Sequence, residues 1–87
     1  MVIWDDVKRK NIPLDEIKKG SPEYEAMESA AKNGDMFAQH AMGLWNELVG
    51  KKIDEALKWY NKAANQGLDD SRKSYDDLIH EMKGEKI

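Results

Sequence analysis

The chain of 87 residues lacks three things: cysteine, a long hydrophobic run and an excess of basic residues. Without cysteine there is no disulfide framework, no thiolate ligand for zinc and no cysteine nucleophile. No apolar stretch is long enough to cross a membrane, and residues 1–11 carry acids where a secretory signal needs a basic start. These absences predict a cytoplasmic protein with no membrane partner.

The charge balance argues against nucleic acid as a partner. The 14 basic and 17 acidic residues give a net charge of -3, and the two signs are interspersed along the chain. The largest basic cluster is 8–10, whereas a phosphate backbone needs a concentrated basic face. The length suits one small domain that covers residues 1–87.

The sequence does contain clear signals for where helices begin and end. Ser21 is a suitable N-cap, Pro22 fits the first helical position, and Gly34 supplies the left-handed residue that ends the helix. The next segment, 35–49, has no proline and stops before Gly50. We therefore expect two consecutive helices joined by a short turn.

Two more helices are expected after Gly50. One begins with Asp54 as its cap and ends at Gly67, and the last runs from residue 69 or 70 to 83. A short helix is expected over 13–19. No segment alternates with period two over more than four residues, so the sequence predicts no strand. The short links between the helices make sequence neighbours antiparallel.

Helical periodicity separates the roles of these helices. Apolar residues cover about half the circumference of 35–49, which predicts neighbours on more than one side. The 54–66 helix has one apolar side, on which Trp59 and Tyr60 are adjacent. The last helix has a narrower apolar stripe, which is typical of a terminal helix covered on one side only.

The chain also contains an internal repeat. The sequence SAAKNG at 29–34 aligns with KAANQG at 62–67 at an offset of 33 residues. The same shift pairs Met27 with Tyr60, and Ala38 with Ser71. An alanine pair lets another helix approach closely, and the glycine that follows reverses the chain, so repetition of this device predicts stacked helical hairpins.

These residues resemble the Sel-one-like repeat, a relative of the tetratricopeptide repeat. The matching positions lie in AAKNGDMFAQHAMG and DEALKWYNKAANQG: Ala30, Ala31, Gly34, Ala38, Gln39, Met42, Gly43, Ala56, Trp59, Tyr60, Lys62, Ala63, Ala64 and Gly67. The resemblance covers about residues 21–83. Asn46 departs from it, because the family favours tyrosine at that position.

The resemblance implies an all-α fold, a short α/α solenoid of antiparallel helical hairpins. Its core is the repeat at 21–67, with 1–20 as an N-terminal capping segment and 68–87 as a C-terminal capping helix. In this family Gly43 and Ala56 let paired helices touch, and Tyr60 fills the space between repeats. Members typically act as scaffolds or adaptors, which implies a non-catalytic protein-protein interaction module that binds a protein or peptide.

On a tetratricopeptide-like hairpin, one side of the first helix tends to line a concave groove. The apolar stripe of Phe37, Ala41, Leu44 and Leu48 lies on that side. The residues expected to contact the partner are Phe37, His40, Leu44, Lys73, Asp77 and His80. The other interpretation is that the apolar residues are covered by the N-terminal segment, through Ile3, Trp4, Ile12 and Leu14.

The sequence contains no strong metal-binding or catalytic motif. The two histidines, His40 and His80, lie far apart in the sequence without ligand spacing, and we expect both to face solvent. Adjacent acids such as Asp76 and Asp77 point in different directions on a helix, and no nucleotide or hydrolase motif is present. We expect no metal, no cofactor and no enzyme. The alternatives are a self-associating unit that forms a homodimer and a small inhibitor that docks on an enzyme through its acidic last helix.

Overall fold

The computed structural model of the chain describes residues 14–84, without the side chains of 15, 82 and 83. These residues form a 3-10 helix and four α-helices: η1 (Leu14–Glu16), α2 (Pro22–Lys32), α3 (Met36–Leu48), α4 (Ile53–Asn65) and α5 (Asp69–Gly84). No strand occurs among them, which confirms the all-α prediction. The short helix expected over 13–19 is reduced to the single turn of η1.

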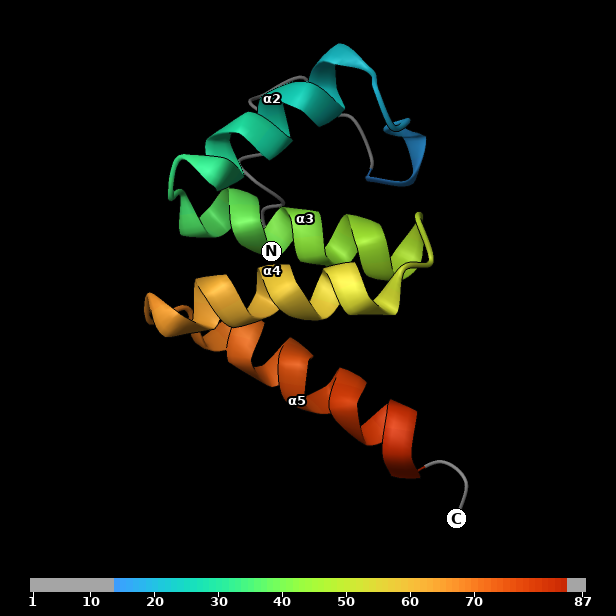
Figure 1. The fold of residues 1–87 in the computed structure, drawn as a ribbon, viewed down its shortest axis with the longest axis vertical. Coiled ribbons are helices and arrows are strands. Elements are labelled where there is room, and N and C mark those ends of the chain that lie inside the picture. Colours follow the sequence, from blue (N-terminus) through green and yellow to red (C-terminus); the bar gives the residue numbers. More distant parts are fainter. Residues whose placement is uncertain (1–13, 85–87) are drawn as a thin grey trace.

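Each α-helix packs against the helix that follows it in the sequence, and η1 packs against α3. Figure 1 shows the four helices stacked one after another, with neighbours nearly antiparallel. The far end of α5 leans away from α4 in the same view. Helix α3 therefore has neighbours on more than one side, as its broad apolar surface predicted.

Polar side chains fix the starts of two helices. Ser21 Oγ accepts a hydrogen bond from the Tyr24 amide at 3.2 Å, and Asp35 Oδ1 accepts one from the Phe37 amide at 2.9 Å and another from the Ala38 amide at 3.1 Å. These bonds satisfy amide groups that have no partner within the first turn. The N-cap predicted at Ser21 is confirmed.

The prediction that Asp54 caps the next helix is wrong. Helix α4 begins at Ile53, and Lys52 occupies the cap position without a side-chain hydrogen bond. The chain reverses at Lys51, whose φ of 58° is left-handed, and the Lys52 amide donates to the Asn46 carbonyl at 2.8 Å. The turn itself thus sets the start of α4, and Asp54 favours the helix only as an acid in the first turn.

The turns after α2 and α4 have the same construction. Gly34 and Gly67 have φ values of 103° and 105° and lie 33 residues apart. Each glycine amide donates to the carbonyl three residues before it, at 3.1 and 2.9 Å. The residue after each glycine donates to the carbonyl five residues before it, at 3.1 and 3.2 Å. The repeat seen in the sequence is therefore also a repeat of backbone geometry.

Two glutamines join these turns at one end of the structure. Gln39 is buried and donates from Nε2 to the Ala31 carbonyl at 3.0 Å. Gln66 donates from Nε2 to Gln39 Oε1 and to the Gly34 carbonyl, both at 2.9 Å. The turn after α4 is thus tied to the turn after α2.

The core consists of two clusters on either side of the α3–α4 pair. The first contains Tyr24, Met27 and Trp45, with Trp59 packed against it, and the second is built around the fully buried Tyr60. Adjacent aromatic residues in α4 therefore belong to different clusters, because neighbouring side chains on a helix point about 100° apart. Helix α4 therefore meets a neighbour on each of two sides, α3 and α5, although its sequence shows one apolar side.

Gly43 lies where α3 and α4 come closest. A Cβ atom there would meet Cδ1 and Cε1 of the Tyr60 ring and lie 3.1 Å from its Cγ. Ala56 on α4 is fully buried. The close approach that the family resemblance implied for Gly43, Ala56 and Tyr60 is present.

The part of the N-terminal segment that the structure describes packs against the first cluster. Ile17 is buried, and its carbonyl accepts a hydrogen bond from Trp45 Nε1 at 2.8 Å. Leu14 packs against the same cluster. The remaining residues expected to cover the groove, Ile3, Trp4 and Ile12, lie outside the described residues.

Candidate partner-binding surface

Helix α3 carries a line of apolar side chains along one side. Phe37 and Leu48 are 54% and 55% exposed, and Leu44 between them is half-buried against the second cluster. At about 100° per residue, all three lie within about 20° of one direction around the helix. We call Phe37, Leu44 and Leu48 the α3 stripe. Leu14 packs against the first cluster and Phe37 is 54% exposed, so the described part of the N-terminal segment, 14–20, leaves Phe37 largely uncovered.

The predicted contact residues on α5 are also accessible. Lys73, Asp77 and His80 are exposed, and Lys73 Nζ lies 4.0 Å from Asp77 Oδ2. An exposed ion pair of this length contributes little to stability. These side chains are therefore available to another molecule.

His40 is the predicted site residue whose environment differs from expectation. It was expected to face solvent, but it is 6% exposed, and its Nδ1 lies 2.6 Å from the hydroxyl of the fully buried Ser71. Its ring is 5.5 Å from that of Tyr60. The periodicity of α3 alone could not reveal this burial, because it depends on how α5 crosses α3 near Ser71. His40 therefore joins the two helices.

Burial lowers the pKa of His40, because the charged imidazolium loses solvation, and the nearby acids Asp70 and Glu47 oppose this effect only in part. The phenol of Tyr60 donates to Glu47 Oε1 at 2.6 Å, and burial together with this bond raises the pKa of Tyr60. The polar groups between α3, α4 and α5 therefore favour a neutral imidazole and a protonated phenol at neutral pH.

The stability of the protein should fall below neutral pH because of His40. The lowered pKa means that the folded protein binds this proton less readily than the unfolded chain does. The neutral imidazole of His40 contributes fully to the free energy of unfolding above the ordinary pKa of 6.5. This contribution is lost as the pH falls from 6.5 through the lowered pKa of the folded state. Urea unfolding between about pH 7.5 and about pH 5.5 measures it.

The free energy of unfolding of the His40→Gln variant is expected to fall less with decreasing pH than that of the wild type. The His80→Gln variant, a change at an exposed histidine, should show the same fall as the wild type. Equal declines in the wild type and His40→Gln would contradict the prediction.

Leu48 is a large exposed side chain that the predicted contact set omitted. Its position eleven residues after Phe37 was the available signal, since that spacing returns to the same side of a helix. Two acidic residues of α5, Asp70 and Glu81, were also omitted, whereas Asp77 was included. Asp70 is close enough to His40 to influence its pKa, and Asp77 and Glu81 continue the same side of α5 and are exposed. The same side of α5 also carries Lys73, so it has three acids and one base; we call Asp70, Asp77 and Glu81 the acidic edge.

Within residues 14–84 no helix is both long and apolar enough to cross a membrane. No group of three or more histidine, cysteine or acidic side chains in that range is placed to hold a metal ion. Comparison of the chain with protein-family models, with curated proteins and with solved structures finds no match. The family membership suggested by the sequence therefore stays a prediction.

Proposed function

We propose that this chain is a non-catalytic protein-interaction module, built as a short helical solenoid, that holds a segment of another protein against the α3 stripe. The solenoid is supported by the two equivalent turns and by the packing of each helix on the next. The binding role rests on one observation: Phe37 and Leu48 are large, apolar and more than half exposed on the same side of one helix. Exposed apolar side chains that gather in this way favour an interaction site.

The partner we propose is an amphipathic helix with basic residues beside its apolar side. Such a helix lays its apolar face on Phe37 and Leu48, since the stripe runs lengthwise along α3. Its basic side chains meet the acidic edge formed by Asp70, Asp77 and Glu81 on α5, and His80 lies near the end of that edge. Opposite charges at the rim favour association and orient the partner.

The double variant Phe37→Ser/Leu48→Ser tests this function. Both positions are exposed, so we expect the free energy of unfolding to change by no more than about 1 kcal/mol. Affinity for a captured and purified partner should fall at least about tenfold, because truncating central apolar residues of an interface has effects of that size. Calorimetric titration with that partner gives the measurement.

A matched control removes charge rather than apolar surface. Lys58→Ser and Lys62→Ser change exposed residues on α4, away from the α3 stripe, and should bind as the wild type does. Undiminished binding by the double variant would exclude the stripe as the binding surface. Light scattering across a concentration series tests the homodimer alternative. If the wild type is a dimer and Phe37→Ser/Leu48→Ser is a monomer, the α3 stripe is a self-association surface instead.

A further inference from the structure

A second concave region lies on the opposite side of α3, between α2 and α4. This cavity has a volume of about 390 Å³. Met42 and Asn46 of α3 line it, Tyr24 comes from α2 and Trp59 from α4. On the α3 helix, Asn46 points about 180° away from Phe37. The cavity is therefore separate from the α3 stripe.

Two polar side chains that line this cavity lack full hydrogen bonding. Asn46 is 4% exposed and donates from Nδ2 to the Met42 carbonyl at 2.8 Å, while its Oδ1 accepts no hydrogen bond from residues 14–84. Tyr24 is 7% exposed, and its hydroxyl makes no hydrogen bond within the same range. Buried polar groups almost always have partners. An acceptor and a hydroxyl without partners at one cavity point to a ligand with hydrogen-bonding groups of its own.

The hydroxyl of Tyr24 is available as a donor. Burial raises its pKa, and the nearby carboxylates of Glu28 and Glu55 raise it further, so the phenol stays protonated. The cavity therefore offers one acceptor, Asn46 Oδ1, and one donor, Tyr24 Oη. The N–H and C=O of a peptide unit have the complementary pattern.

The rim of the cavity carries more positive than negative charge, although the chain as a whole is acidic. Lys19, Lys32 and Lys52 line it together with Glu28 and Glu55. Both acids have cations nearby: Glu28 lies 3.9 Å from Lys32, and Glu55 lies 3.6 Å from Lys58.

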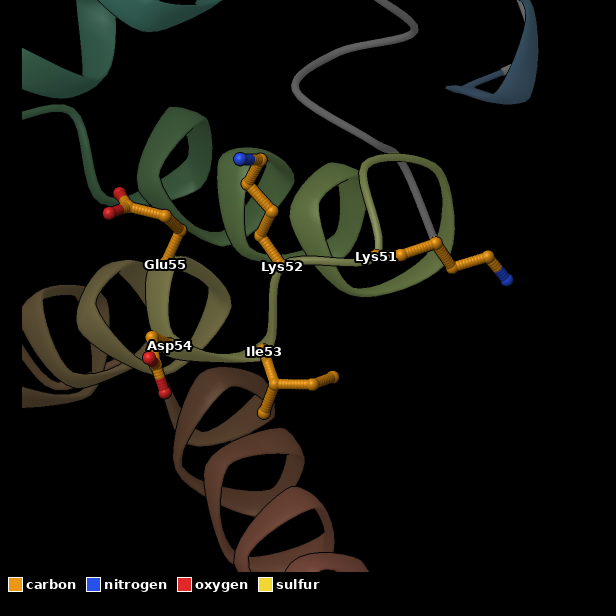
Figure 2. A pocket seen from close by; sticks show the side chains of 5 residues that line it. All are labelled: Lys51, Lys52, Ile53, Asp54 and Glu55. Atoms are coloured by element: carbon orange, nitrogen blue, oxygen red, sulfur yellow. The ribbon is translucent and has the colours of Figure 1, made fainter.

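Lys19 and Lys52 make no ion pair within the described part of the chain. Figure 2 shows a neighbouring depression at the start of α4, where Lys52 and Glu55 extend on the side of α2, whereas Ile53 and Asp54 extend toward α5. The unpaired lysines favour an acidic ligand.

The apolar part of the cavity suits a single side chain. Met42 is 1% exposed at its base, and the half-buried Trp59 packs against the first cluster at its side. An aliphatic side chain placed there would contact the indole of Trp59.

From these observations we propose that the cavity between α2 and α4 binds an extended acidic peptide segment. One peptide unit of the segment pairs with Asn46 Oδ1 and the Tyr24 hydroxyl. The side chain at that position packs against Trp59, and acidic residues on either side of it meet Lys19 and Lys52. The site is independent of the proposed function of the α3 stripe, so a chain could bind at both faces.

Two capped pentapeptides test the proposal, one with leucine between pairs of glutamates and one with leucine between pairs of lysines. In ¹H–¹⁵N NMR titrations of the whole chain, the glutamate peptide should shift the side-chain amide of Asn46 and the indole N–H of Trp59. The side-chain amide of Gln66, which donates to the Gly34 carbonyl and lies outside the cavity, serves as the internal reference and should not move. The lysine peptide should shift neither signal.

Variants of the lining residues sharpen the test. Asn46→Leu removes the acceptor and should weaken binding of the glutamate peptide at least about tenfold. Lys52→Gln should weaken it, whereas Lys62→Gln, an exposed change on α4 outside the cavity, should not. If Asn46→Leu does not fold, the two lysine variants decide.

Three results would overturn the proposal. The first is that neither peptide shifts Asn46 or Trp59, in which case the cavity holds only water. The second is equal shifts from both peptides, and the third is equal binding by Lys52→Gln and Lys62→Gln.

Discussion

Replacing Gly43 with alanine is expected to lower the free energy of unfolding by about 1–3 kcal/mol. The added methyl group would overlap Cδ1 and Cε1 of Tyr60, and the ring has little room to move, because Tyr60 is fully buried and its hydroxyl is hydrogen-bonded to Glu47. The cost of this steric overlap exceeds the gain of about 1 kcal/mol in helix propensity that alanine brings relative to glycine. Urea unfolding followed by circular dichroism measures the difference.

The same substitution should change sign when the ring is removed. Tyr60→Leu takes away the aromatic atoms that the new methyl group would meet. In that background Gly43→Ala should be neutral or stabilising, since the helix preference for alanine then acts unopposed. A double-mutant cycle isolates the contact. If Gly43→Ala costs as much with Leu at position 60 as with Tyr, the close approach of α3 and α4 is not the cause.

Replacing Trp45 with alanine should be the most damaging single change in the first cluster, with an expected loss of about 3–5 kcal/mol. Trp45 is 5% exposed, and its ring packs edge-on against that of Tyr24 with centroids 4.8 Å apart. Its indole N–H donates a hydrogen bond to the Ile17 carbonyl. A loss of this size is a large share of the total stability of a domain of this length. The expected result is a chain that is largely unfolded at low urea concentration.

Two further variants separate the causes. Trp45→Phe keeps an aromatic ring but removes the N–H, so it should cost less than Trp45→Ala while still releasing Ile17. Trp59→Ala is the matched control: Trp59 lies at the edge of the same cluster and is only half-buried, so its truncation should cost less than that of Trp45. Equal losses at positions 45 and 59 would contradict the distinction between core and edge.

Much of the architecture follows from local signals in the sequence. The cap at Ser21 and the left-handed glycines at 34 and 67 act within one turn of the chain, so their effect can be predicted without knowing the tertiary structure. The close approach at Gly43 was implied by the resemblance to the Sel-one-like repeat, and it agrees with the cost of a glycine inside a helix. Ser21 and the two left-handed glycines set both ends of α2 and the end of α4.

Other features depend on contacts between distant residues, and the sequence did not predict them. The burial of His40 requires Ser71, which is 31 residues away and belongs to another helix. The start of α4 depends on the left-handed turn at Lys51 rather than on the acid at position 54. In the candidate surface, Leu44 is half-buried because it packs against the second cluster, formed by α4 and α5, whereas Phe37 is exposed. Periodicity places both on one line but cannot say which is covered.

The matching turns at Gly34 and Gly67 also affect how such a chain can change in length. The segment 35–67 ends in the same backbone geometry in which it begins, since both glycines are left-handed and both turns have the same hydrogen bonds. A tandem copy of that segment, inserted after Gly67, would continue from Gly67 in the same direction in which residue 35 continues from Gly34. Its first helix would follow α4 through a turn of the same construction as the one that joins α2 to α3. Duplication of one gene segment would thus lengthen such a protein without a new kind of turn between helices.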